Sequence, residues 1–275
     1  MTTLPDNKVA VVTGASVGIG GATAERLLAD GWQVVGIDVD LAGFDELAAA
    51  HPARAAGVHD DVADPAAHER AVVLARELGV LCGWVNNAGI ENTTRAHDFS
   101  EVDYRAVLDI NCDGVAYGCR AALGAFISNA VPGRIVNVSS VRGIASFPDG
   151  FAYEAAKGAV EQMTRSIAVQ YGHLGIRCNA VRPGAILTPL AERLDIGEAP
   201  DREARIREIG EMHPLERRMI MPDEVAAAIA FLLSDDASAI SGAALHVDAA
   251  MTARCFPAPL TDDIQFDSSH SDNAR

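Results

Sequence analysis

The segment Val9-Ala10-Val11-Val12-Thr13-Gly14-Ala15-Ser16-Val17-Gly18-Ile19-Gly20 decides the fold. It opens with a short apolar run, which is typical of a strand buried on both faces. The glycines at 14, 18 and 20 then predict a tight turn from that strand into a helix. Such a turn lets the backbone approach a pyrophosphate and points free N–H groups of the helix start at it. The segment therefore predicts a dinucleotide-binding unit.

An acidic residue closes the second predicted strand, about twenty residues after the glycine turn. This residue is Asp38, in the run Val34-Val35-Gly36-Ile37-Asp38. A carboxylate there can accept hydrogen bonds from both ribose hydroxyls of an adenosine, and it would repel a 2′-phosphate. No Lys or Arg stands at 36–40, and Val17 in the turn is uncharged. These residues favour NAD over NADP. The alternative is that Asp38 only caps the helix that follows it.

Short apolar runs alternate with longer amphipathic stretches along the rest of the chain, which is typical of repeated βαβ units. The expected strands are Val9–Thr13, Gln33–Asp38, Ala55–His59, Gly83–Asn86, Arg134–Ser139, Arg177–Val181 and Ala244–Val247. The expected helices are Gly18–Asp30, Leu41–Ala50, Pro65–Leu78, Glu101–Asn129, Ala152–Tyr171 and Pro222–Leu233. The pattern predicts an α/β fold: one doubly wound domain over 1–252 with a seven-stranded parallel sheet. Within it, the charged insertion 188–220 is expected to cover a site, and 253–275 form a C-terminal tail.

Composition narrows the class of protein. The chain has 275 residues, and 22 Lys+Arg against 38 Asp+Glu give a net charge of −16. This charge argues against a nucleic acid or an anionic membrane as the main partner. There is no apolar run of membrane-spanning length, and the N-terminus lacks a signal sequence, so we expect a cytoplasmic protein. The five cysteines form no CxxC and no Cys/His cluster, which predicts reduced thiols and no metal site.

Three polar residues form a candidate catalytic set. Tyr153 and Lys157 are four residues apart, so they share a helix face. A phenol is a poor base at neutral pH, but an ammonium beside it together with an oxidised nicotinamide would lower its pKa. Ser140 ends the preceding strand, and its hydroxyl can hold a substrate oxygen while Tyr153 exchanges the proton.

Together, Thr13–Gly20, the Asn86-Asn87-Ala88-Gly89 turn, Asn111, Ser140, Tyr153, Lys157 and Pro183-Gly184 resemble the short-chain dehydrogenase/reductase family in order and spacing. The resemblance covers residues 8 to about 250. It implies a Rossmann-fold oxidoreductase that uses NAD or NADP. It also implies that Tyr153 is the acid/base, that Ser140 orients the carbonyl or alcohol, and that Lys157 binds the nicotinamide ribose. Asn111 would complete a proton relay by holding a water.

The same resemblance implies a set of cofactor contacts. They are Gly14, Ser16, Val17, Gly18, Ile19, Gly20, Asp38, Asp61, Val62, Asn87, Ala88, Gly89, Tyr153, Lys157, Pro183, Gly184, Ile186 and Thr188. In one place the chain departs from the family pattern. Relatives usually carry a pair of glycines after the Val-Asp of the last strand, whereas here Ala249-Ala250 follow. This substitution puts the geometry of that turn in doubt.

The segments 90–96, 141–151 and 184–212 are expected to line the substrate. Their apolar candidates are Ile144, Phe147, Phe151, Leu187, Leu190 and Leu194. Arg142 and Glu91 can also face the pocket. Arg142 either binds an anionic or hydroxyl-rich substrate or pairs with Glu91.

The leading hypothesis is an NAD-dependent enzyme that interconverts a secondary alcohol and a ketone. The alternatives are an epimerase or dehydratase of the family's extended branch, and an NAD-binding regulator without catalysis. The apolar residues of the helices at 101–129 and 152–171 exceed what one sheet face needs, and relatives pair these helices. We therefore expect a homodimer or homotetramer. The apolar part of the tail, 253–266, is expected to dock on the insertion or on a neighbouring subunit.

Overall fold

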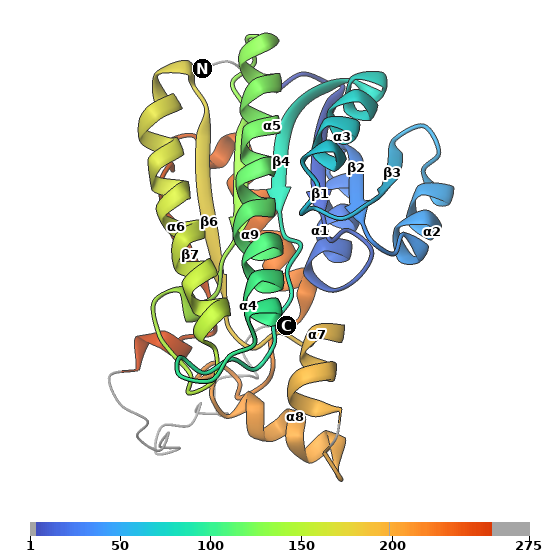
Figure 1. Cartoon of the computed structure of the whole chain (residues 1–275). Helices are drawn as coiled ribbons and strands as arrows, with labels where there is room; N and C mark the ends of the chain where they lie inside the picture. The colour runs from blue at the N-terminus through green and yellow to red at the C-terminus, as the bar shows by residue number, and fades with distance from the viewer. Residues whose placement is uncertain (1–3, 198, 255–275) are drawn as a thin grey trace, which may run out of the picture.

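A computed structural model describes residues 4–197 and 199–254 (Figure 1). Seven parallel strands form one sheet in the order β3-β2-β1-β4-β5-β6-β7. They are β1 (Lys8–Thr13), β2 (Gln33–Asp38), β3 (Ala55–His59), β4 (Val80–Asn86), β5 (Arg134–Val138), β6 (Arg177–Pro183) and β7 (Ala244–Val247). The strand order reverses between β1 and β4, which opens a crevice at the carboxyl edge of the sheet. The predicted doubly wound fold is confirmed.

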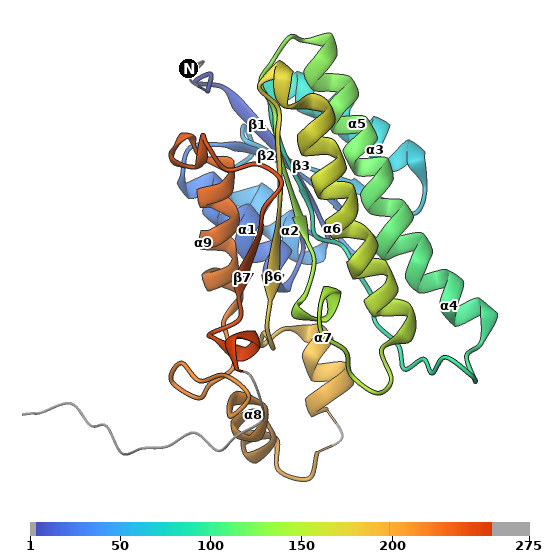
Figure 2. The same cartoon turned by 90° about the vertical axis from the view of Figure 1, so that its left-hand side faces the viewer.

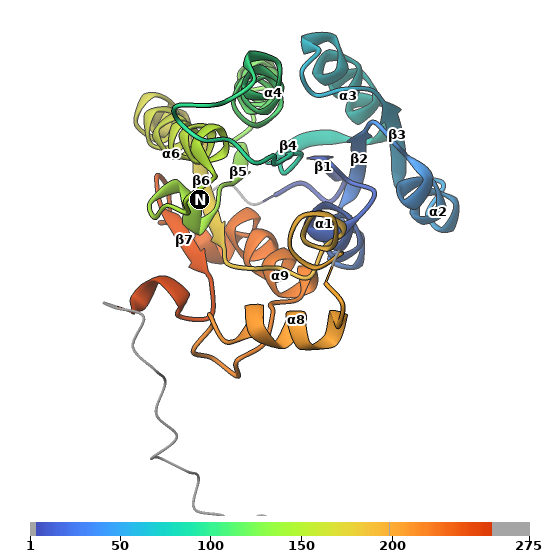
Figure 3. The same ribbon diagram turned by 60° about the horizontal axis from the view of Figure 1, so that its bottom comes forward.

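Helices cover both faces of the sheet (Figures 2 and 3). On one face lie α1 (Gly18–Ala29), α2 (Ala42–Ala50) and α9 (Pro222–Leu233). On the other lie α3 (Pro65–Leu78), α4 (Glu101–Leu108), α5 (Gly114–Ser128) and α6 (Phe151–Tyr171). Each face has its own apolar core, with Leu27, Phe44 and Ile229 in one and Trp84 and Phe126 in the other. These two cores hold the carboxyl edge in place beneath the site.

The predicted helix over 101–129 is interrupted by a π-helical turn, Asp109–Asp113. This turn carries Asn111, whose side chain bonds to the backbone of Ile90 in both directions. Asn111 Oδ1 accepts from Ile90 N at 2.8 Å, and Asn111 Nδ2 donates to Ile90 O at 2.7 Å. A π turn often marks a functional site, and here it brings a fully buried amide beside the loop that leaves β4.

The insertion 188–220 contains no strand among its described residues and folds over the carboxyl edge (Figure 1). It comprises α7 (Pro189–Ala191), a π-helical turn (Glu192–Ile196) and α8 (Arg202–Gly210). A small separate core of Ala191, Ile196, Ile209 and Met219 stabilises it. The tail expected to dock begins at the end of the described residues, and the docking prediction for 255–266 falls outside them.

The apolar residues of α4, α5 and α6 were expected to leave a surface for a second subunit, but several of them pack inside the subunit. Val107, Phe126 and Val160 are fully buried against the sheet or its helices. A periodic apolar face cannot by itself distinguish core packing from subunit packing. The oligomeric state therefore stays a prediction.

Among the described residues, no helix is long and apolar enough to cross a membrane, and no group of three His, Cys, Asp or Glu side chains could hold a metal ion. The four described cysteines, at 82, 112, 119 and 178, are free thiols. The turn after β7 keeps its left-handed backbone without glycine, since Ala249 has φ 46° and Ala250 has φ 67°. Residues with a Cβ adopt this region only at a cost.

Candidate active site

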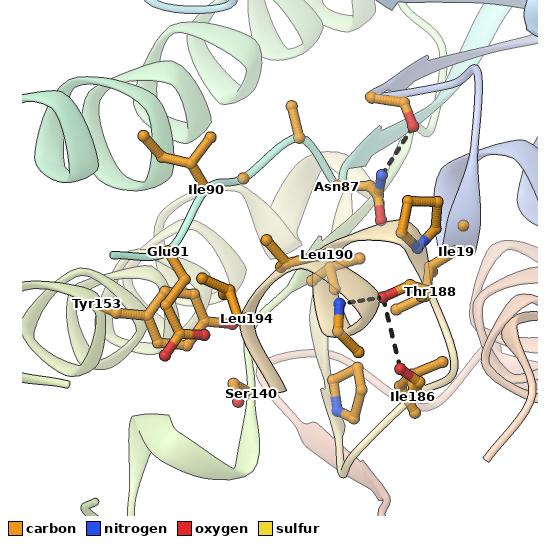
Figure 4. A pocket seen from close by; sticks show the side chains of 18 of the residues that line it. Ile19, Asn87, Ile90, Glu91, Ser140, Tyr153, Ile186, Thr188, Leu190 and Leu194 are labelled. Atoms are coloured by element: carbon orange, nitrogen blue, oxygen red, sulfur yellow. Dashed lines mark hydrogen bonds between the residues drawn. The ribbon is translucent and has the colours of Figure 1, made fainter. Parts of the chain in front are cut away.

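A cavity of about 440 Å³ opens at the carboxyl edge of the sheet (Figure 4). The ends of β1 to β6 and the insertion all contribute to its lining. Most of the predicted cofactor residues line it: Gly14, Val17, Gly18, Ile19, Asp38, Asp61, Val62, Asn87, Ala88, Gly89, Tyr153, Lys157, Pro183, Gly184, Ile186 and Thr188. The fold therefore gathers residues from 14 to 188 around one space.

The glycine turn is shaped by backbone contacts. Gly14 and Gly18 have φ of +63° and +59°, a region that glycine enters without strain. A Cβ on Gly20 would lie 1.9 Å from the carbonyl oxygen of Gly14, so no larger residue fits there. The start of α1 is thus drawn close to the strand, leaving its N–H groups toward the cavity. This geometry fits the pyrophosphate of a dinucleotide.

The turn after β4 is hydrogen-bonded to the glycine turn after β1. Thr13 Oγ1 accepts hydrogen bonds from the backbone N of Asn87 and of Ala88, each at 2.9 Å. The Asn87 amide donates back to the carbonyls of Thr13 at 2.9 Å and Gly14 at 3.1 Å. The turns after β1 and β4 therefore form one rigid cradle.

Asp38 lies at the end of β2, half-buried, on the wall of the cavity. Its carboxylate accepts from the backbone N of Ser16 at 3.0 Å and of Asp40 at 3.2 Å. Asp60 and Asp61 line the same wall. The nearby Arg70 is already paired with Asp60 and Asp64. The wall is thus acidic where an adenosine ribose would lie.

Tyr153, Lys157 and Ser140 converge on the cavity, as the sequence predicted. The Lys157 ammonium is 5.4 Å from the centroid of the Tyr153 ring, and its Nζ donates to the carbonyl of Val138 at 2.8 Å. Lys157 is 3% exposed. Ser140 Oγ accepts from the backbone N of Arg142 at 3.1 Å, which fixes the hydroxyl at the end of β5.

In the protein by itself, burial is the largest cause of the pKa shifts of Tyr153 and Lys157. The lowering of the tyrosine pKa by Lys157 together with an oxidised nicotinamide stays a prediction. Burial raises the pKa of Tyr153 to about 12, and the charge of Glu91 adds to the rise, against a hydrogen bond with Ser140 and the charge of Arg142. Burial lowers the pKa of Lys157 to about 8, although Glu91 opposes this. For both groups, desolvation outweighs the opposing effects of neighbouring groups.

The start of α6 is held by a residue that sequence reasoning missed. Thr94 is 2% exposed, and its hydroxyl accepts from the backbone N of Ala152 at 3.0 Å. Its backbone also bridges the loop before the helix: Thr94 N donates to Asp149 O, and Phe151 N donates to Thr94 O. Thr94 therefore caps the helix one residue before Tyr153. Its only sequence signal is a threonine in the segment 90–96.

Comparison with known proteins agrees with this geometry. A family model described as enoyl-(acyl carrier protein) reductase matches residues 14–252. The chain belongs to the short-chain dehydrogenase/reductase family. It is 39% identical to a 2-(R)-hydroxypropyl-CoM dehydrogenase of Xanthobacter autotrophicus, over 90% of this chain and 99% of the relative. It is 43% identical to a cis-4-hydroxycyclohexanecarboxylate dehydrogenase of Sinomonas cyclohexanicum, over 90% and 97%.

Solved structures similar to this chain include a dehydrogenase of the same fold. The ligand-free aldohexose dehydrogenase of Thermoplasma acidophilum superposes with a TM-score of 0.83 at 36% identity, covering 93% of this chain and 97% of that one. The relatives are dehydrogenases of alcohols, and the chain is an oxidoreductase of the short-chain dehydrogenase/reductase family.

Some predicted contacts of the short-chain dehydrogenase fold do not line the cavity. Ser16 and Gly20 lie behind its wall: Ser16 bonds to Asp38 and Asp40, and Gly20 packs on Gly14. Asn111, predicted as a catalytic residue, is also absent from the lining, and its side-chain amide is hydrogen-bonded to the backbone of Ile90. Ile144, Phe151 and Leu187 are also outside the lining; Ile144 and Phe151 are exposed, and Leu187 packs on the core of the insertion.

Phe147, Leu190, Leu194, Glu91 and Arg142 do line the substrate end. Residues that were not singled out join them, namely Ile90, Asp195, Met212 and Met251. Three of these lie in the segments 90–96 and 184–212 expected to line the substrate. Met251 follows the last strand, and only the folded turn at Ala249-Ala250 brings it back to the cavity.

Arg142 pairs with carboxylates of the protein itself. Its Nη1 donates to Glu91, and its Nε donates to Glu154 Oε1 at 3.3 Å. The guanidinium carbon lies 5.1 Å from the ring centroids of both Phe147 and Tyr153. Of the two roles weighed for Arg142, the pairing with Glu91 is the one observed.

Proposed function

We propose that this protein is an NAD-dependent dehydrogenase that interconverts a secondary alcohol and a ketone. The observation that carries the proposal is the convergence of Tyr153, Lys157 and Ser140 on the cavity that also contains the glycine turn. The relatives support it, because one is named for a hydroxylated ring and another for an aldohexose.

The proposed choice of NAD rests on Asp38. Its carboxylate is held by two backbone N–H groups, so it cannot easily turn away from a bound ribose. A 2′-phosphate there would meet Asp38 and the acidic wall of Asp60 and Asp61. Repulsion and desolvation would both oppose its binding.

In the proposed reaction, Tyr153 exchanges a proton with the alcohol or carbonyl oxygen, and Ser140 holds that oxygen through its hydroxyl. Lys157, fixed by Val138, would bind the nicotinamide ribose and supply positive charge beside the phenol. When bound, NAD would supply a hydride acceptor and a positive charge that favours the phenolate form of Tyr153, which burial disfavours. Asn111 would act by positioning the Ile90 loop next to the site.

A steady-state assay tests the proposal. The protein is given a panel of secondary alcohols with NAD and, separately, with NADP. We expect turnover with NAD and a kcat/KM at least about 10-fold higher than with NADP. The double variant Asp38→Ser with Val39→Arg should reverse that preference. Wild-type preference for NADP would overturn the cofactor assignment, and turnover of no alcohol or ketone would overturn the reaction class.

We also propose a homodimer or homotetramer that forms through the helices at 101–129 and 152–171. Support comes from apolar side chains that the subunit leaves exposed on them: Val102 is 77% exposed and Val169 is 85% exposed. Sedimentation at micromolar concentration checks this, and a single species of 28.8 kDa would contradict it.

A further inference from the structure

The substrate end of the cavity contains one guanidinium among three carboxylates. Arg142, Glu91 and Asp195 line the cavity, and Glu154 contacts Arg142. Three of these side chains are largely buried: Arg142 and Glu154 are each 16% exposed, and Glu91 is 20% exposed. Asp195 is exposed at the rim. Figure 4 shows Glu91 beside Tyr153, with Leu194 close by. The group therefore lies where the substrate meets the acid/base.

The cluster is a packed arrangement and not a loose surface pair. Glu154 Oε1 accepts from the backbone N of Phe147 at 2.7 Å as well as from Arg142. The Arg142 guanidinium is packed on the rings of Phe147 and Tyr153. A Cβ on Gly150 would lie 1.6 Å from Arg142 Nη2, so the glycine leaves the space that the guanidinium needs. Arg142 is thus held in place from several elements.

The charge of the cluster affects which substrates the cavity can bind. With three carboxylates and one guanidinium, its formal charge is 1 − 3 = −2. Burial raises the pKa of Glu91, against the charge of Arg142, and it raises the pKa of Asp195, against the charges of Arg205 and Arg142. Two further cations lie nearby. The Lys157 ammonium donates to the carbonyl of Val138, and Arg205, outside the cavity lining, donates to the backbone carbonyl of Asp195. A substrate carboxylate would meet the largely buried Glu91, where water screens repulsion poorly, and the exposed Asp195 would add to that repulsion.

We propose that this site selects uncharged alcohols and excludes carboxylates, and that Glu91 enforces the selection by occupying Arg142. The Glu91 carboxylate takes the position on the guanidinium that a substrate carboxylate would otherwise take. The guanidinium of Arg142 could bind an anion, but the carboxylate of Glu91 already pairs with it and so keeps a substrate anion away. This inference rests on the proposed function, because it names the substrate class of the same cavity.

A matched pair of alcohols tests it. The probes are cis-4-hydroxycyclohexanecarboxylate and its methyl ester, assayed at pH 8 with NAD. The ester is the larger molecule, so exclusion by size would favour the acid, whereas exclusion by charge favours the ester. We expect kcat/KM for the ester to exceed that for the acid by about 100-fold or more. Equal values within about 3-fold would overturn the proposal.

Variants identify the group responsible. Glu91→Gln removes one carboxylate and frees Arg142, so the preference for the ester should fall by about 10-fold or more. Glu77→Gln, an exposed change at the end of α3, removes the same charge far from the cavity and should leave the ratio unchanged. Arg142→Met should not admit the acid. If Arg142→Met instead abolishes existing turnover of the acid, Arg142 is the substrate's anion site and the proposal is wrong.

A binding measurement separates this proposal from the proposed function. With NADH present, thermal shifts are recorded with cyclohexanecarboxylate and with its methyl ester. The wild type should be stabilised by the ester alone, and Glu91→Gln by both compounds. This result without any turnover would sustain the selection by charge and refute the dehydrogenase assignment. Equal stabilisation of the wild type by the acid and the ester would refute the selection, whatever the activity.

Discussion

The two ends of the cavity are built in different ways. At the cofactor end, glycines and backbone groups of two neighbouring turns set the shape, as in the contacts among Thr13, Gly14 and Asn87. At the substrate end, long charged side chains from separate loops meet, as Glu91, Arg142 and Glu154 do. A backbone cradle is fixed by local sequence, whereas a side-chain cluster exists only once distant loops have been brought together. The comparison can be tested by changes at each end.

The largest effect is expected where the two ends meet. Tyr153→Phe removes the exchangeable proton and keeps the ring that packs on Arg142. General acid–base catalysis contributes roughly 10²–10⁴-fold, so kcat should fall at least that far while NAD affinity is retained. Steady-state kinetics and a titration with NAD measure the two quantities. A kcat within a few-fold of the wild type would show that another group moves the proton.

A change at the cofactor end should act on binding. Gly20→Ala places a Cβ 1.9 Å from Gly14 O, so the turn must open. NAD affinity should fall by about 10-fold or more, and the free energy of unfolding should drop by about 1–3 kcal/mol. Gly172→Ala is the matched control, because an added Cβ at this exposed residue meets nothing within 4 Å. Unchanged NAD affinity in Gly20→Ala would mean that the turn does not hold the cofactor.

A substitution of Thr94, which holds the helix that carries Tyr153, should lower kcat more than it lowers the affinity for NAD. Thr94→Val keeps the volume of a buried side chain but removes the hydroxyl that caps α6 at Ala152. Loss of a cap costs about 1 kcal/mol of stability. We expect kcat to fall several-fold through misplacement of Tyr153, with NAD affinity unchanged. Thr94→Ser keeps the hydroxyl and should restore kcat; if it does not, the hydrogen bond is not the cause.

The pH profile reports on the substrate end. The charge of Glu91 raises the pKa of both Tyr153 and Lys157. Glu91→Gln removes that charge, so Tyr153 loses its proton at lower pH and so does Lys157. Both limbs of the pH profile for alcohol oxidation should therefore move to lower pH. A profile that stays in place or moves to higher pH would show that Glu91 does not act on this pair.

The smallest effect is expected at the turn that carries Met251 back to the cavity. Ala250 has φ 67°, and glycine adopts this region without the Cβ clash. Ala250→Gly relieves strain but adds freedom to the unfolded chain, so a net gain of about 0.5–1 kcal/mol is expected. Thermal or urea unfolding measures it. A loss of stability would mean that the turn is not strained.

Much of the fold could be predicted from the sequence because it depends on short-range rules. Apolar runs buried on both faces give the strands, and three of them match their predicted bounds: Gln33–Asp38, Ala55–His59 and Ala244–Val247. The break at Asp109–Asp113 could not be predicted, because it depends on Asn111 bonding with Ile90, 21 residues away. The rise in the pKa of Tyr153 in the protein by itself could not be predicted either, because burial is a property of the folded state.

The sequence by itself determined the strand-to-helix turn at Thr13–Gly20, the acidic end of β2 and the placement of Tyr153 and Lys157 on one helix face. Each of these follows from residues that are neighbours along the chain, where backbone geometry leaves few choices. Only the tertiary structure decided which residues close the substrate end. Glu91, Arg142 and Asp195 are separated by about fifty residues each, and nothing local specifies their approach. The pairing of Glu91 with Arg142, and the approach of Asp195, arise where the segments after β4 and β5 and the insertion meet at the same edge of the sheet.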